Sequence, residues 1–178
     1  MTDSALWETC NEIPAEVYER YWVPAIFAPW ARLHIARASL HPGERVLDVA
    51  CGTGVVARLA AEIVGPAGRV TGLDISPGLL EVARTLDSGQ QVEWHEGDAL
   101  SLPFANSSFD SALLQHGLQQ FPDRIAGLRE MHRVLRPGGS VVVSTWGRLQ
   151  ESPAWATLLT TRPERMAGGH RPANIFPP

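Results

Sequence analysis

A strand that runs directly into a glycine-rich turn, at residues 45–54, most constrains how this chain can fold. The apolar strand carries a single acid, Asp48, and such a run is typical of a strand buried on both faces of a parallel sheet. After the turn, residues 55–64 place apolar side chains at helical spacing. Gly52 and Gly54 have no Cβ, so a ligand can approach the backbone at the amino end of this helix. The segment therefore predicts the first half of a βαβ unit that binds a nucleoside ligand.

The turn alone does not identify that ligand. Gly52–Ala57 also fits the dinucleotide pattern G-x-G-x-x-G/A, and Asp74 follows at about the 20-residue distance of a ribose-binding acid. An NAD(P)-binding oxidoreductase domain is thus one alternative. A glycine turn that serves only close packing of strand and helix is another.

Size and charge narrow the class of protein. With 178 residues and 44% hydrophobic content, the chain has enough material for one domain with a core. Its net charge is −4, and Lys and Arg form no basic block, so nucleic acid is not an expected partner. The first residues lack the pattern of a signal peptide, and no apolar stretch reaches the roughly 20 residues of a membrane span. A cytoplasmic protein without a membrane span is expected.

The two cysteines, Cys10 and Cys51, lie far apart in a chain without a secretory signal, so a structural disulfide is not expected. A small residue filling the turn is the favoured interpretation of Cys51. Neither the histidines nor the cysteines show the spacing of metal ligands, and no metal is assigned.

Alternating strand and helix patterns continue along the chain. Apolar residues at helical spacing over 12–40, interrupted by Pro24, predict two leading helices. Strands are expected at 45–50, 70–74, 91–95, 109–114 and 140–146, and helices at 54–64, at 77–86 and from 122 to a stop at 136–139. Five strands alternating with helices predict an α/β fold with a doubly wound, mostly parallel sheet, whose ligand lies at the carboxyl ends of the strands.

Three regions are expected: an N-terminal helical cap at 1–40, a ligand-binding α/β core at 41–147, and a Pro/Gly-rich C-terminal tail at 148–178. The tail permits at most one helix, around 154–161, and no sixth strand.

Four blocks in this order resemble the class I S-adenosylmethionine (AdoMet)-dependent methyltransferases, in particular the small-molecule branch of the ubiquinone/menaquinone-biosynthesis type. The blocks are Val46–Gly54, Val70–Pro77 with Leu80–Arg84, Gly97–Phe104 with Ser108–Asp110, and Leu128–Gly139. The resemblance covers about residues 15–147. A dehydrogenase does not need the later two blocks.

The resemblance implies AdoMet as cofactor, S-adenosylhomocysteine as its product and a small-molecule acceptor. It places Asp74 on the ribose hydroxyls, with Ile75 beside it, and Asp98 and the Ala99 amide at the adenine. Asp48 and the backbone around Ala50, Gly52, Gly54 and Gln115 would hold the methionine end. In-line transfer from an activated sulfonium depends mainly on proximity and exclusion of water.

For the residues on the side of the methyl acceptor, the sequence leaves two interpretations open. His116, just after the fourth strand, is a candidate base because a histidine pKa lies near working pH, while a turn histidine with local hydrogen bonds is the alternative. Tyr18, Tyr21 and Trp22 would line or cover the pocket, or else pack in the core.

Two departures from the family pattern stand out. Ala50 replaces the usual first glycine of the turn, and the added methyl is expected to be tolerated. The usual antiparallel pair after the fifth strand is missing, so the fold is expected to be truncated there, with an AdoMet-binding remnant as the alternative function. An uncovered strand at 141–146 would favour a homo-oligomer.

Overall fold

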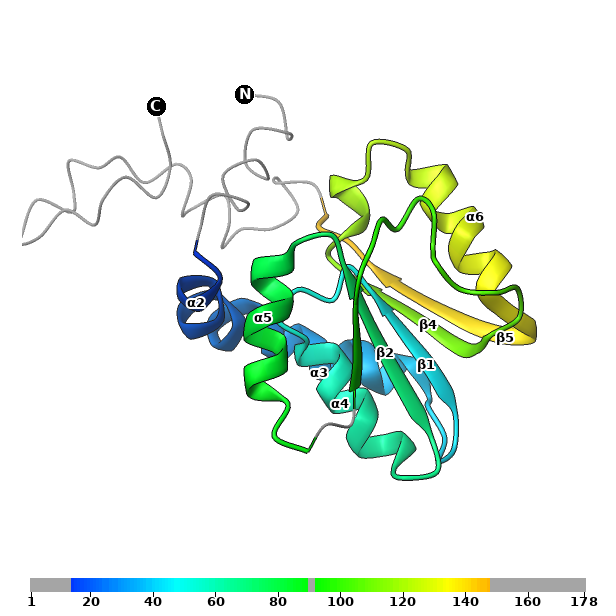
Figure 1. Ribbon diagram of the computed structural model, residues 1–178, viewed down its shortest axis with the longest axis horizontal. Helices are drawn as coiled ribbons and strands as arrows, with labels where there is room; N and C mark the ends of the chain where they lie inside the picture. The colour runs from blue at the N-terminus through cyan, green and yellow to red at the C-terminus, as the bar shows by residue number, and fades with distance from the viewer. Residues whose placement is uncertain (1–13, 90–91, 148–178) are drawn as a thin grey trace, which may run out of the picture. The chain divides into compact units, whose positions relative to one another are not determined.

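A five-stranded sheet with the order β3-β2-β1-β4-β5 is the centre of the fold (Figure 1). The computed structural model describes residues 14–89 and 92–147. Every strand pair is parallel, which confirms the predicted doubly wound α/β sheet. The strands are β1 (Arg45–Val49), β2 (Arg69–Asp74), β3 (Val92–Glu96), β4 (Phe109–Gln115) and β5 (Leu135–Ser144). The helices are α2 (Ala15–Val17), η1 (Tyr18–Phe27), α3 (Ala28–Ala38), α4 (Val55–Val64), α5 (Pro77–Leu86), η2 (Leu118–Gln120) and α6 (Arg124–Val134).

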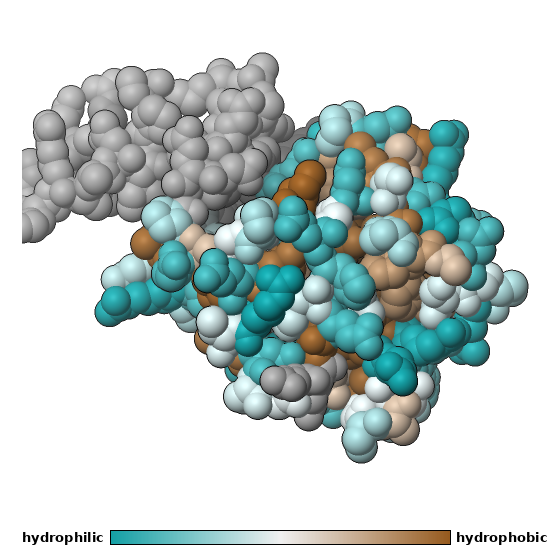
Figure 2. Space-filling view, viewed as in Figure 1, coloured by the Kyte–Doolittle hydropathy of each residue, from teal (hydrophilic) through white to brown (hydrophobic). Residues whose placement is uncertain are grey.

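Helices cover both faces of the sheet. Buried residues of α3 and α4 form one apolar cluster with β1, β2 and β4, around Val46 and Leu113. On the other face, Met131 and Val134 of α6 pack against Leu47 and its neighbours. Both faces of the central strands are therefore buried, as their largely apolar sequences predict. On the side in Figure 2, hydrophilic side chains predominate and apolar atoms show between them.

Strands β1 and β4 are neighbours, and the chain winds outward from them in opposite directions. Open α/β sheets bind ligands at such a switch point, outside the carboxyl ends of the strands. The site is therefore expected between the turn after β1 and the end of β4, at Gln115 and His116.

The leading helical segment differs from the prediction. Residues 15–38 are helical throughout, and Pro24 lies within the π-helical element η1 instead of separating two helices. The wider π-helical turn accommodates the proline ring, which in an α-helix clashes with the preceding turn. This segment and the sheet belong to one unit, Ile13–Thr145. The proposed division near residue 40 stays a prediction.

Strand β5 begins five residues earlier than the expected strand at 140–146. Helix α6 ends at Val134, two residues before the predicted stop at 136–139, and the stop residues form an irregularity within β5. Phe109 pairs with Leu135 whereas Ser111 pairs with Ser140, so the extra residues of β5 bulge out of the ladder.

In the described part of the chain, β5 is an edge strand, and Val141 on it is 50% exposed. An oligomer through this edge stays a prediction. The tail at 148–178 and its expected helix lie outside the described residues. None of the described helices is long and apolar enough to cross a bilayer.

Candidate cofactor and acceptor site

The turn after β1 bends through left-handed backbone conformations. Ala50, Gly52 and Gly54 have φ angles of 54°, 56° and 83°. A left-handed conformation costs a residue with a Cβ about 1–2 kcal/mol, so Ala50 adopts at some cost a conformation that glycine adopts freely. Gly54 then begins α4 without a side-chain cap, which leaves amides of the first turn directed at the site.

Asp74 ties this turn to the next helix. One carboxylate oxygen accepts a hydrogen bond from the Gly52 amide at 2.7 Å, and the other accepts one from the Ser76 amide at 2.9 Å. The side chain is 7% exposed, and burial raises its pKa, while the backbone amides oppose that shift. A carboxylate has about four lone-pair positions. Asp74 can therefore anchor the turn and still accept hydrogen bonds from a ligand.

Asp48 is a second acid on the adjacent strand. It is 1% exposed, and its Oδ2 atom has no hydrogen-bond partner in the described residues. Burial raises its pKa to about 8, Asp74 adds repulsion, and the Ala57 amide and Arg58 lower the pKa. The buried hydroxyl of Thr53 also has no partner among these residues. An unpartnered carboxylate oxygen beside a second acid suits a cationic ligand group.

The loop after β3 carries the expected adenine-side residues. Asp98 is exposed and its Oδ1 accepts a hydrogen bond from the Leu100 amide at 2.8 Å, so the carboxylate shapes its own turn. Ala99 is buried behind it, whereas Ile75, at the end of β2, is 70% exposed. An isoleucine so exposed beside two acid-bearing loops offers an apolar surface to a flat ring.

Gln115 and His116 occupy the end of β4, on the other side of the switch point. Gln115 Nε2 donates to the Phe27 carbonyl at 3.0 Å, which joins the N-terminal helices to the site. The His116 ring lies 6.2 Å from Phe27 and 5.9 Å, edge-on, from Trp30. Burial and then the nearby His34 lower the pKa of His116 to about 4. The expectation of a pKa near working pH is wrong, because aromatic side chains bury this ring.

Residues 47–143, more than half of the chain, match the family "Methyltransferase domain". The chain belongs to this family. It is 43% identical over 118 residues to the 2-phytyl-1,4-naphthoquinone methyltransferase of Synechococcus elongatus, a match that covers 64% of this chain and 51% of the relative. It is 40% identical over 114 residues to the demethylmenaquinone methyltransferase of Staphylococcus epidermidis, covering 64% and 47%.

Among solved structures, an S-adenosylmethionine-dependent methyltransferase from Mesorhizobium loti is 32% identical, with a TM-score of 0.58 and coverage of 66% of this chain and 52% of that one. The chain thus spans about half the length of the curated relatives it matches. The resemblance inferred from the four sequence blocks is confirmed at the level of family and fold.

The two glycines of the turn after β1, Gly52 and Gly54, have different neighbours. A Cβ on Gly54 would collide with the indole of Trp94, whose Cζ3 would lie 2.7 Å away. Trp94 from β3 also fills the space over Gly72, where its Cζ3 would lie 2.6 Å from a Cβ. Gly54 is therefore required for packing against Trp94. The space beside Gly52 is more open, because its nearest neighbour is the Tyr18 hydroxyl at 3.7 Å.

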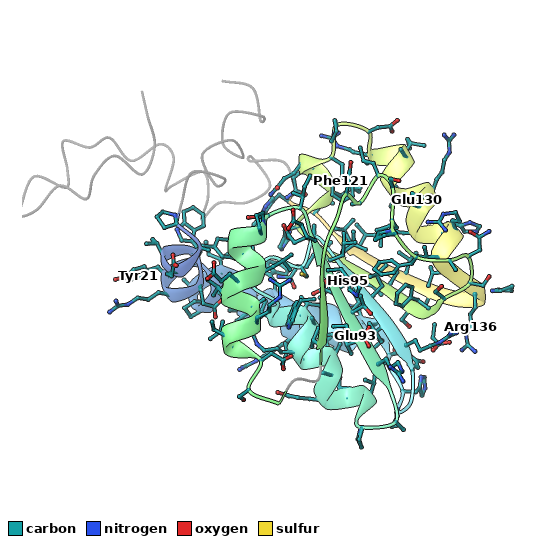
Figure 3. All side chains as sticks on the ribbon, viewed as in Figure 1. Tyr21, Glu93, His95, Phe121, Glu130 and Arg136 are labelled. Atoms are coloured by element: carbon teal, nitrogen blue, oxygen red, sulfur yellow. The ribbon has the colours of Figure 1, made fainter. Side chains whose placement is uncertain are left out.

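The three aromatic residues expected at the pocket lie in different environments. Tyr18 reaches the glycine turn and packs against Phe27, with ring centres 5.1 Å apart. Tyr21 is 57% exposed and points outward, with the Arg20 guanidinium 5.3 Å from its ring centre (Figure 3). Trp22 is partly buried. The structure brings Tyr18 to the turn and leaves Tyr21 at the surface.

Two residues of α6 for which the sequence predicted no role, Glu130 and Arg133, hold the loop after β3 in place. Glu130 on α6, labelled in Figure 3, accepts a hydrogen bond from the Leu102 amide at 2.8 Å. Arg133 donates to the carbonyls of Leu102 and Phe104 at 2.9 and 2.7 Å. The two side chains also form a 2.7 Å ion pair. Opposite charges three residues apart within the fourth sequence block are the signal that could have identified this clamp.

Proposed function

We propose that this domain binds AdoMet and transfers its methyl group to a naphthoquinone-type small molecule. The observation that carries the proposal is the pair of buried acids, Asp48 and Asp74, at the glycine turn. Asp48 has an unpartnered carboxylate oxygen, which fits a ligand ammonium group, and Asp74 keeps acceptor positions for ribose hydroxyls. A dinucleotide would instead bring its anionic pyrophosphate to this glycine turn, beside the two acids.

The remaining residues fit the rest of the same ligand. Ile75 would cover one face of the adenine, and Asp98 and the Ala99 amide would meet its polar edge. Gln115 and the turn backbone at Ala50, Gly52 and Gly54 would surround the methionine end. Bound AdoMet supplies a methyl group already activated on a sulfonium.

The protein's task is then to orient the acceptor and exclude water. Phe27 and Trp30 offer apolar ring surfaces beside His116, which suits a flat aromatic acceptor. Burial lowers the pKa of His116 to about 4, which keeps the imidazole neutral at pH 7 but makes it a weak proton acceptor. Its position at the end of β4 beside Phe27 and Trp30 is what supports His116 as the candidate base. The naphthoquinone class is proposed because the matched relatives from Synechococcus and Staphylococcus carry such names.

Ligand-induced stabilisation tests the cofactor. AdoMet and S-adenosylhomocysteine should raise the melting temperature, because saturation at 100 times the dissociation constant adds about 2.7 kcal/mol. NAD(H) and NADP(H) should leave it unchanged. A shift with the nicotinamides alone would contradict the proposal. Asp74→Ala should weaken AdoMet binding about 10- to 150-fold, the scale of hydrogen bonds to a charged group. Glu62→Ala, at an exposed acid in the last turn of α4, is the control.

Methyl transfer needs a separate assay. Radiolabelled AdoMet and a short-chain demethylmenaquinol should yield a labelled product, and His116→Ala should lower turnover about 10²–10⁴-fold with little change in AdoMet affinity if His116 is the base. Equal turnover would remove that role. AdoMet binding without turnover on any quinol, phenol or carboxylate would favour the alternative of a binding remnant.

A further inference from the structure

Helix α3 has a second side that the fold does not use. Its buried residues lie on one side, and the opposite side is exposed. When α3 is projected at the helical rotation of 100° per residue, Leu33 lies near the centre of the exposed side. We call this side the outer face of α3. It consists of Pro29, Trp30, Arg32, Leu33, Ala36 and Arg37.

The outer face combines large apolar side chains with exposure. Leu33 is 59% exposed and Trp30 is 48% exposed, one helical turn apart. Pro29 and Ala36 extend the apolar surface on either side of Leu33. A single exposed leucine is ordinary, but a contiguous apolar strip with a tryptophan and a polar rim indicates an interaction surface.

Charge on the outer face is positive. Arg32 lies to one side of Leu33, and Arg37 lies one turn beyond Leu33 on the side of Trp30. Helix α3 contains no acidic residue. Neither arginine forms an ion pair with another described residue. The whole chain, in contrast, carries a net charge of −4. This local excess of positive charge is complementary to an anionic surface.

The outer face also adjoins the acceptor side of the site. The Trp30 ring, half exposed on α3, meets the His116 ring edge-on at 5.9 Å. His116 lies at the carboxyl end of β4, where the acceptor is expected. An apolar molecule held against the outer face therefore lies next to the candidate acceptor site.

We propose that the outer face of α3 binds the surface of an anionic lipid bilayer. Leu33 and Trp30 enter the interfacial region, and Arg32 and Arg37 contact lipid phosphates. Tryptophan is suited to this depth because one edge of its ring is polar. That a lipid-soluble acceptor would enter the site from the bilayer past Trp30 rests on the proposed function. Bilayer binding itself does not require methyl transfer.

Vesicle sedimentation tests the proposal with the full chain and no AdoMet. The chain should pellet with vesicles of phosphatidylglycerol and phosphatidylcholine in equal parts, and less with phosphatidylcholine alone. Leu33→Glu should weaken binding about tenfold or more by placing a charge in the apolar strip. Ile125→Glu is the matched control, because Ile125 on α6 is 57% exposed, close to the 59% of Leu33.

A charge variant provides an independent test. Arg32→Gln/Arg37→Gln should weaken binding to the anionic vesicles about 25-fold, since each arginine near such a surface contributes about fivefold. The control is Arg124→Gln/Arg129→Gln on α6, which should bind like the wild type. The same variants should keep the thermal shift with AdoMet, so that a loss of bilayer binding is distinguished from a loss of cofactor binding.

Three outcomes would overturn the proposal. The wild type could fail to pellet with anionic vesicles at low salt, or the α6 controls could lose as much binding as the α3 variants. The third is self-association that Leu33→Glu abolishes without any vesicle binding, which would assign the outer face to a second copy of the chain.

Discussion

The methyl group of Ala50 fills the space that a side chain at Gly117 would need. A Cβ on Gly117 would lie 2.7 Å from the Ala50 Cβ and 2.9 Å from Leu114 Cδ1. Gly117 has an ordinary φ of −102°, so its backbone would accept alanine. A side chain at Gly117 is therefore excluded by lack of space and not by the backbone conformation. The close approach of Gly117 to Ala50 packs the segment after β4 against the turn after β1.

Gly117→Ala should lower the free energy of unfolding by about 1–3 kcal/mol, the usual cost of overpacking. Ala50→Gly should gain more stability in the Gly117→Ala chain than in the wild type, because only there does it also remove a clash between two methyl groups. Urea denaturation measures both. Gly78→Ala is the control, because Gly78 lies in α5 with no atom within 4 Å of its added Cβ and should be neutral or stabilising. An unchanged stability of Gly117→Ala would contradict the inferred contact.

Gly54→Ala should destabilise the fold more than Gly52→Ala. Both residues have positive φ, so both substitutions carry about 1–2 kcal/mol of backbone cost. Only Gly54→Ala also collides with Trp94, which adds about 1–3 kcal/mol. Trp94→Leu should relieve part of the Gly54→Ala defect in a double-mutant cycle. Equal losses for the two glycine variants would show that Trp94 moves aside.

The pH dependence of stability should reveal the buried Asp48. Its pKa rises from 3.8 to about 8 in the fold, so the native state binds more protons than the unfolded state between these values, and this contribution to stability falls as pH rises. His34 and His116 have the opposite effect, because folding lowers their pKa values from 6.5 to about 4. Between these values the unfolded state binds more protons, so their contribution to the free energy of unfolding rises with pH up to about 6.5. Above pH 6.5 the acid effect is unopposed by these histidines.

Unfolding free energy should therefore decline from pH 6.5 to pH 8, with a slope of up to about 1.4 kcal/mol per pH unit for one group. Asp48→Asn cannot titrate and should flatten this decline. Urea titrations at several pH values measure the slope. A decline that is as steep in Asp48→Asn as in the wild type would assign it to other groups.

Arg133→Ala should weaken AdoMet binding through the loop that carries Asp98, although Arg133 itself lies on α6. The variant loses hydrogen bonds to the Leu102 and Phe104 carbonyls and leaves Glu130 without its ion-pair partner. We expect a loss of about 1–3 kcal/mol in unfolding free energy and a several-fold weaker affinity. Arg129→Ala, an exposed arginine on the same helix, is the matched control. Adenosine binding should fall with AdoMet binding, whereas a purely structural role predicts lower stability with unchanged affinity of the folded protein.

Local patterns were sufficient for the fold class, and they also predict where the candidate site lies. The buried strand with one acid, the glycine turn and the alternation of strands with helices are short-range signals, and parallel connectivity then brings the strand ends to one edge. The Ser76 cap and Pro77 likewise fixed the start of α5, where Ser76 Oγ accepts a hydrogen bond from the Leu79 amide.

The roles of individual residues depended on the tertiary structure. Whether Gly54 faces a ligand or Trp94 is decided by a side chain 40 positions away, and the low pKa of His116 comes from burial under Phe27 and Trp30. The course of the N-terminal helices through Pro24 also required the observed π-helical backbone. Sequence periodicity reports which face of an element is buried, but contact partners and desolvation arise only when distant segments pack together.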